Sequence, residues 1–253
     1  MIKLFRNIRN KLIKENKTVA YFKYAIGEIV LVVIGILLAL QINTWNQNRL
    51  SLIEEQQILK NLKADFDNNK DILQSTVSES KESIRYCLAM LNHTGFKEKP
   101  ETARTFDSIL NGIFNAPAYS PVNGTLDEII NSGKLSVIMD EDLRKKLSSW
   151  KPIIEIIKGR FDETKLNQNY LNEYMLEHGN WLNADQVSYE NRSITFPTSG
   201  FIVDNRKLLE DQKFENMVEN IAIGLDNYLI QLNRTERLLD DILKQINTDI
   251  KND

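Results

Sequence analysis

The 253-residue chain has a single cysteine, Cys87, and only two histidines, His93 and His178. One cysteine excludes an intrachain disulfide and any zinc site built from several thiolates. The histidines lie far apart in the sequence, and neither belongs to an HExxH or similar metal-ligand spacing. We therefore expect no metal and no cofactor. Cys87 is interpreted as a small buried apolar residue, with an intermolecular disulfide as the alternative.

Motifs for catalysis are also missing from the sequence. No GxSxG, GxGxxG or Walker-type phosphate loop occurs. Acidic pairs such as Glu54 with Glu55 and Asp240 with Asp241 are adjacent, so on a helix they point to different sides and cannot act as an acid/base pair. We therefore predict that the chain is not an enzyme.

Positive charge is concentrated near the N-terminus, although the whole chain carries a net charge of -3. The remainder must therefore be clearly acidic. An acidic domain is poorly suited to phosphate backbones, so nucleic acid is not expected as a partner. The basic residues of the first stretch are Lys3, Arg6, Arg9, Lys11, Lys14, Lys17 and Lys23.

One long apolar run follows this basic stretch, from Tyr24 to Asn43, with Glu28 as its only charge. About twenty such residues are needed to cross a hydrocarbon core, so residues 24–45 are predicted to be a transmembrane helix in contact with the lipid bilayer. The sequence LALQINTW at its end lacks the small-x-small pattern of a signal-peptide cleavage site, which favours a retained anchor.

The orientation of the anchor follows from the basic residues that precede it. The positive-inside rule places residues 1–23 in the cytoplasm and exports residues 46–253. Tyr21, Tyr24 and Trp45 lie where aromatic residues anchor a helix at the two interfaces.

Within the cytoplasmic tail, apolar residues recur at helical spacing between the basic ones. This pattern is typical of a basic amphipathic helix on an anionic leaflet, and a docking motif is the alternative. The apolar positions are Leu4, Phe5, Ile8 and Leu12.

A stripe on the transmembrane helix combines its charge with small residues. Glu28, Gly35, Ala39 and Ile42 are separated by 7, 4 and 3 residues, which places them on one narrow face at 100° per residue. Gly35 and Ala39 form a small-xxx-small pair, so this face is predicted to bind a second copy of the chain or a partner membrane helix. Alternatively, Glu28 snorkels to the headgroups or pairs with a basic neighbour.

Seven-residue spacing of apolar positions predicts long helices in residues 46–253. Leu52, Leu59, Phe66 and Leu73 predict a helix that ends near Gly95. A second set predicts a helix over residues 211–251, comprising Val218, Leu225, Leu232, Leu239 and Ile246.

A third long helix is predicted over residues 141–177. Asp140 precedes it as an N-cap, Gly179 follows it, and Pro152 is expected to bend it. Its predicted buried side comprises Trp150, Ile153, Ile157, Phe161, Tyr170 and Tyr174.

Two irregular zones separate these helices. Residues 97–139 are expected to hold a short helix at 106–114 and a capping box at Thr125 and Glu128 that closes at Gly133. Residues 180–204 are expected to form a loop with a short hairpin. The fold class is therefore all-α: one transmembrane helix followed by an elongated helical bundle with an irregular cap. Ordinary bundle packing is favoured over a self-associating coiled coil.

Two stretches carry a family resemblance. Tyr24-Ala-Ile-Gly-Glu-Ile-Val-Leu-Val-Val-Ile-Gly-Ile36, followed by Gln41-Ile-Asn-x-Trp-Asn46, resembles the N-terminal signature of an uncharacterised family of membrane-anchored proteins in Bacteroidetes. Ser132-Gly-Lys-Leu135, followed by Leu143-Arg144, resembles a second stretch of that family. The resemblance implies a bacterial inner membrane and a periplasmic domain. It brings no activity and no site residues.

Three functions are compatible with these features. The first is an interaction or scaffold protein that presents its cap to a periplasmic protein partner and assembles with copies of itself. The second is a sensor or binding module with aromatic residues around a small-molecule pocket, namely Tyr119, Trp181, Tyr189 and Phe196. The third is a subunit of an ion-linked membrane assembly that uses Glu28.

Overall fold

The computed structural model describes residues 18–186 and 196–250. The predicted amphipathic helix of the tail lies mostly outside these residues. The chain divides into two compact units, Met1–Gln57 and Ile58–Asp253. Helix α2 (Thr18–Leu91) contributes to both units, and the remaining described elements belong to the second.

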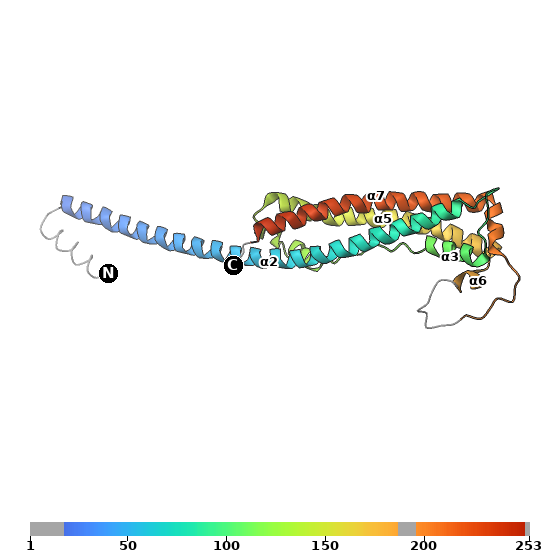
Figure 1. The fold of residues 1–253 in the computed structure, drawn as a ribbon. Helices are drawn as coiled ribbons and strands as arrows, with labels where there is room; N and C mark the ends of the chain where they lie inside the picture. The colour runs from blue at the N-terminus through green and yellow to red at the C-terminus, as the bar shows by residue number, and fades with distance from the viewer. Residues whose placement is uncertain (1–17, 187–195, 251–253) are drawn as a thin grey trace. The chain divides into compact units, whose positions relative to one another are not determined.

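Three long helices form the second unit: the latter part of α2, α5 (Glu141–His178) and α7 (Gln212–Asp249) (Figure 1). Helices α2 and α5 run in the same direction, because Phe66 packs on Trp150 near one end and Cys87 lies in a cluster with Leu171 near the other. Helix α7 runs the opposite way. Each 38-residue helix is about 57 Å long at 1.5 Å per residue.

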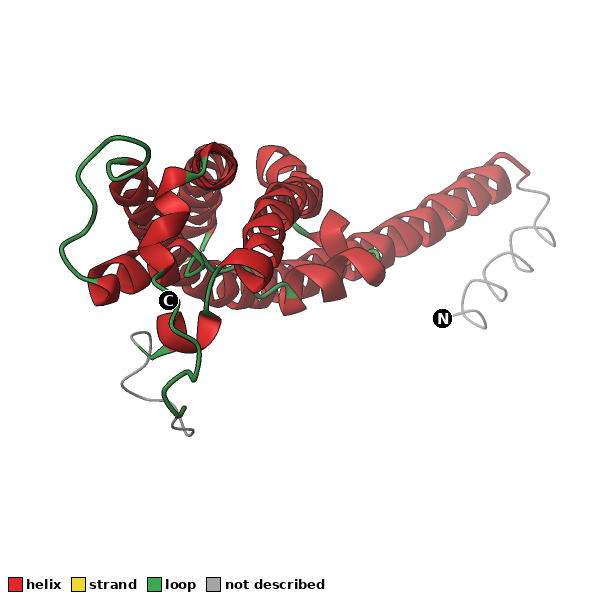
Figure 2. Cartoon of the chain, turned by 90° about the vertical axis from the view of Figure 1, so that its right-hand side faces the viewer, coloured by secondary structure: helices red, strands yellow, loops and turns green. Residues whose placement is uncertain are grey.

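Short elements cover the two ends of this bundle. Helices α3 (Ala103–Ile113) and α6 (Trp181–Asp185), with the 3-10 helix η2 (Asn205–Glu210), form one end, which we call the cap. Helix α4 (Gly124–Asn131) and the 3-10 helix η1 (Lys134–Val137) form the other end, the base. Figure 2 faces the cap and shows helices and loops, with no strand in the described residues. The predicted all-α bundle with an irregular cap is confirmed.

The predicted heptad positions are buried, except Leu52, which is half-buried. Leu59, Phe66 and Leu73 of α2 are at most 1% exposed, and all five heptad residues of α7 are fully buried. The prediction that Tyr170 of α5 is buried is wrong, because this residue is 52% exposed. Its neighbour Leu171 takes the inward position, and consecutive residues of a helix point 100° apart.

The ends of α5 follow their sequence signals. The Asp140 carboxylate accepts hydrogen bonds from the backbone N–H groups of Asp142 and Leu143, at 2.7 and 2.9 Å. Gly179 is the C-cap. Helix α5 continues through Pro152.

The predicted capping box of α4 is wrong. Its N-cap residue is Asn123, and the Thr125 N–H donates to Asp65 Oδ2 of α2 at 3.0 Å. A carboxylate from another helix therefore takes the place of the Glu128 side chain, which would accept from this N–H in a capping box. The helix does end before Gly133, which has a φ of 72°. A short hairpin was predicted within residues 180–204, but residues 180–186 and 196–204 contain no strand.

The return segment, residues 114–123, connects the cap to the base along the bundle. Asn69 of α2 is fully buried and holds this segment through both its amide atoms. Its Nδ2 donates to the Val122 carbonyl at 2.8 Å, and its Oδ1 accepts from the Val122 N–H at 2.6 Å. Tyr228 of α7 accepts from the Tyr119 N–H at 2.8 Å and donates to the Pro117 carbonyl at 3.2 Å. These side chains satisfy backbone groups that have no ladder partner.

The core consists of two apolar clusters, one toward the base and one toward the cap. The base cluster includes Phe66, Trp150 and Tyr228, and the cap cluster includes Phe106 and Phe214. Small or polar residues occupy the level between them, which we call the polar layer: Ser80 and Ser83 of α2, Thr164 and Gln168 of α5, and Gly224 of α7.

Close packing defines this polar layer. A Cβ atom on Gly224 would lie 3.1 Å from Thr164 Oγ1, so the glycine allows α5 and α7 to approach. Gln168 is 1% exposed and donates from Nε2 to the Ile113 carbonyl at 2.9 Å. At this level α5 therefore packs closely on α7 and binds the end of α3, with fewer apolar side chains than in the clusters on either side.

Candidate functional site

The apolar part of α2 is not covered by any other described residue of the chain. Its large apolar side chains between Ile26 and Ile42 are 47–66% exposed, whereas those of the bundle core are 9% exposed or less. This stretch is long and apolar enough to cross a membrane. It is the one such stretch among the described residues.

The predicted association face lies in this part of α2. Gly35 and Ala39 are exposed, Ile42 is 66% exposed and Glu28 is half-buried. A Cβ atom on Gly35 would meet nothing within 4 Å. The four residues share one face of the helix by their spacing, and open space lies over its small residues.

The predicted interface aromatics also lie in α2. Tyr21 and Tyr24 fall in its first turns, and Trp45 lies at the far end of the apolar stretch. Tyr24 is 51% exposed and Trp45 is 67% exposed. Exposed aromatic residues at both ends are compatible with membrane interfaces.

At the cap, three large apolar side chains are exposed on loops. Phe96 and Ile202 are fully exposed, and Phe201 is 79% exposed. Phe96 follows Gly95, whose φ of 68° turns the chain out of α2 and whose N–H donates to the Leu209 carbonyl at 2.8 Å. This turn fixes the position of the Phe96 loop against η2.

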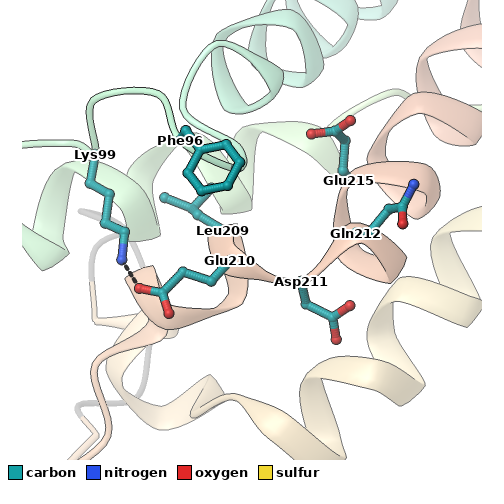
Figure 3. A pocket seen from close by; sticks show the side chains of 8 residues that line it. Phe96, Lys99, Leu209, Glu210, Asp211, Gln212 and Glu215 are labelled. Carbon is teal, nitrogen blue, oxygen red and sulfur yellow. Dashed lines mark hydrogen bonds and ion pairs between the residues drawn. The ribbon is translucent and has the colours of Figure 1, made fainter.

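An acidic hollow of about 570 Å³ lies beside the Phe96 loop (Figure 3). The Lys99 ammonium pairs with Glu210 and keeps the pKa of that carboxyl below its usual value. The Tyr174 hydroxyl donates to Asp211 and lowers the pKa of that carboxyl. Three carboxylates against one ammonium make the hollow acidic. The lining consists of Gly95, Phe96, Lys99, Leu209, Glu210, Asp211, Gln212 and Glu215.

A second, polar hollow of about 290 Å³ lies between α3, α6 and the start of η2. Asp107 and Asn205 form its buried part, being 5% and 2% exposed, and Asn205 Nδ2 donates to Asp107 Oδ1 at 2.8 Å. The other lining residues are Ala103, Arg104, Asn183, Gln186 and Val203. Its lining within residues 18–186 and 196–250 contains no aromatic side chain.

Side-chain caps hold the walls of this polar hollow. Asn180 caps α6 by accepting from the Asn183 N–H at 3.1 Å, and its own N–H donates to Asn205 Oδ1 at 2.8 Å. Arg206 pairs with Asp204 at 2.7 Å and donates to the Glu101 carbonyl at 3.0 Å. These contacts fix η2 and α6 against the start of α3.

Burial raises the pKa of the Asp107 carboxyl above its usual value. The Asn205 amide lowers this pKa, and the nearby Asp204 carboxylate raises it further. The charged form of Asp107 is therefore held at a cost in the folded chain.

We expect Asp107→Asn to gain stability relative to the native chain as pH rises. Because the folded pKa is raised, the folded state binds more protons than the unfolded state, and the native chain loses stability from about pH 4 up through the folded pKa. The asparagine variant has no such loss and still accepts from Asn205. Urea unfolding of both chains at pH 3.5 and pH 7 measures the difference. A variant that becomes relatively less stable at pH 7 would contradict this account.

Tyr119 and Trp181, two of the aromatic residues suggested as pocket walls, lie in different parts of the bundle. Tyr119 is 6% exposed in the base cluster, and Trp181 packs edge-on against Phe114 near the cap cluster. Phe196 is half-buried, and Tyr189 lies outside the described residues. Neither Tyr119 nor Trp181 lines the two hollows of the cap.

Sequence reasoning missed the polar hollow. Asp107 and Asn205 are 98 positions apart, and neither belongs to a motif. Their pairing depends on how η2 packs on α3, which no local spacing encodes.

The cysteine and histidines fill structural positions. Cys87 is fully buried as predicted, and burial raises the pKa of its thiol to about 12. His93 follows the end of α2, where its Nδ1 lies 2.6 Å from the Glu98 carbonyl. His178 ends α5. The described residues hold no group of three or more His, Cys, Asp or Glu that could bind a metal ion.

Within the residues that the structure describes, fold and sites together define a helical protein with one candidate membrane span and a capped three-helix bundle. A family model described as a family of unknown function (DUF6090) matches residues 28–218, and the chain belongs to this family. No curated protein and no solved structure matches the chain.

The second signature stretch of the sequence forms the turn between α4 and α5 at the base. Gly133 supplies its left-handed residue, and Leu143 is fully buried. Arg144 donates to the carbonyls of Ile138 and Met139, the latter at 3.0 Å. These contacts give this stretch a structural role.

Proposed function

We propose that the chain is a single-pass membrane protein that holds its helical bundle at a membrane to bind a protein partner, without catalysis. The exposed apolar stretch of α2 carries this proposal. Exposing apolar surface to water costs roughly 25 cal/mol per Å², and a bilayer removes that cost.

The basic residues before Tyr24 support a cytoplasmic N-terminus, and the family resemblance supports a periplasmic bundle in a Bacteroidetes inner membrane. A reporter enzyme active only in the periplasm tests this topology. Fused after Asp253 it should be active, and fused before Met1 it should be inactive. The reverse pattern would overturn the orientation.

The partner of the cap is a protein that offers a basic group to the acidic hollow and an apolar surface to Phe96. Two observations support this: the full exposure of Phe96 and the unpaired Glu215 carboxylate, which has no ion pair within the described parts of the chain. A photo-crosslinking residue at position 96 should capture this partner, whereas one at Ile230, on the outer face of α7, should not. Equal capture at both positions would argue against a cap interface.

We also propose that the face with Glu28, Gly35, Ala39 and Ile42 binds a second copy in the membrane. Gly35→Leu should weaken this association several-fold because it fills the close approach between helices. Val33→Leu, on another face, should leave it unchanged. A membrane two-hybrid assay measures both variants. If they behave alike, the face is not an interface, and Glu28→Gln separately tests the contribution of the charge.

A further inference from the structure

The polar hollow of the cap holds a nearly buried carboxyl group that pairs with no cation in the described parts of the chain. Asp107 is 5% exposed, and its side chain has one hydrogen-bond partner in residues 18–186 and 196–250, Asn205. No lysine or arginine of these residues pairs with it. A buried charge usually has a partner of opposite sign, because desolvation is costly. The wall of the hollow therefore presents an acceptor suited to a small cation.

Arg104, which has no ion pair with another described residue, lies at the rim of the same hollow. Arg104 precedes Asp107 by three positions in α3, so both side chains lie on the same face of the helix. Arg104 is exposed, and it makes no hydrogen bond or ion pair within the described segments. Its guanidinium suits the planar, two-oxygen geometry of a carboxylate.

The side-chain amides of Asn183 and Gln186 also line the hollow, together with Asp107 and Arg104. Asn183 Nδ2 donates to the Val203 carbonyl at 3.4 Å, and Gln186 Nε2 donates to the Pro197 carbonyl at 3.3 Å. The side-chain oxygens of both amides accept no hydrogen bond from any described residue. They are therefore available to accept N–H groups of a ligand.

The apolar part of the lining is small. Ala103 and Val203 are the aliphatic residues of the described lining, which offers no aromatic ring for stacking. A volume of about 290 Å³ fits a ligand of a few heavy atoms with a short side chain. Large aromatic or extended ligands do not match these walls.

We propose that this polar hollow binds a small zwitterion of the free α-amino acid class. The ligand ammonium group lies against Asp107 with the oxygens of Asn183 and Gln186, and its carboxylate lies against Arg104. This site is independent of membrane anchoring and of the cap partner, so neither proposal depends on the other.

Isothermal titration of the full chain in detergent micelles tests the proposal. The probes are glycine, alanine, serine, asparagine and glutamine, each with its N-acetyl and its carboxamide derivative. At least one free amino acid should bind. Both of its derivatives should bind at least about tenfold more weakly, because each loses one charged contact.

Variants locate the binding. Asp107→Asn and Arg104→Gln should each weaken it at least about tenfold, whereas Asp71→Asn and Arg234→Gln, on exposed faces of α2 and α7, should not. Circular dichroism melting checks that every variant is folded. The proposal is wrong if no free amino acid binds at 5 mM, if the N-acetyl derivative binds equally well, or if folded Asp107→Asn and Arg104→Gln chains bind like the native one.

Discussion

A chain lacking residues 1–45 is expected to move from the membrane pellet into the soluble fraction. The deleted part contains the whole exposed apolar stretch, and the retained part keeps both core clusters. Removing about twenty apolar residues removes the favourable transfer into lipid. Ultracentrifugation after an alkaline wash measures the redistribution, and circular dichroism should remain strongly helical.

A shorter deletion is the matched control for this experiment. Without residues 1–17 the chain still begins α2 at Thr18 and keeps the apolar stretch, so it should stay in the pellet. If the chain without residues 1–45 also stays there, something other than the α2 stretch holds it to the membrane. If the released chain loses its helicity, the bundle does not fold by itself.

Asn69→Ala is expected to lower the free energy of unfolding of the bundle by about 1–3 kcal/mol, because it removes two part-buried hydrogen bonds to the Val122 backbone. Each such hydrogen bond contributes about 0.5–1.5 kcal/mol. The truncated amide also leaves a cavity at a fully buried position. Urea unfolding of the soluble chain 46–253, followed by circular dichroism, measures the change.

Asn68→Ala is the control, because Asn68 is the neighbouring residue of α2 and is exposed. It should change the free energy of unfolding by no more than about 0.5 kcal/mol. Equal effects of the two substitutions would mean that the bonds between Asn69 and the return segment contribute nothing to stability.

The long helices could be predicted from the sequence because their signals are local. Leu59, Phe66 and Leu73 are one heptad apart, and a stripe at that spacing must be buried wherever the helix packs. Asp140 likewise caps the helix that begins at the next residue. Such features depend only on neighbours within a few turns.

Contacts between distant segments could not be predicted in this way. Thr125 with Glu128 matches a capping box, yet Asp65 reaches the same N–H group from α2. Asn69 and Asp107 are polar residues of helices that belong to no motif, and their partners lie 53 and 98 positions away in the sequence. The return segment and the polar hollow consist of such pairs, so the structure was needed to find them.

The polar layer bears on how cooperatively the bundle opens. Trp150 makes its apolar contacts within the base cluster, whereas Phe214 makes its apolar contacts within the cap cluster. The polar layer, with Ser80, Ser83, Thr164 and Gln168, provides little apolar contact between the two clusters. We therefore expect the two halves of the bundle to behave as separate foldons. Amide hydrogens of α3 and α6 would then exchange with solvent through a partial opening that leaves the base half intact. In thermodynamic terms, the end of the molecule that carries both hollows could then fluctuate without unfolding the whole.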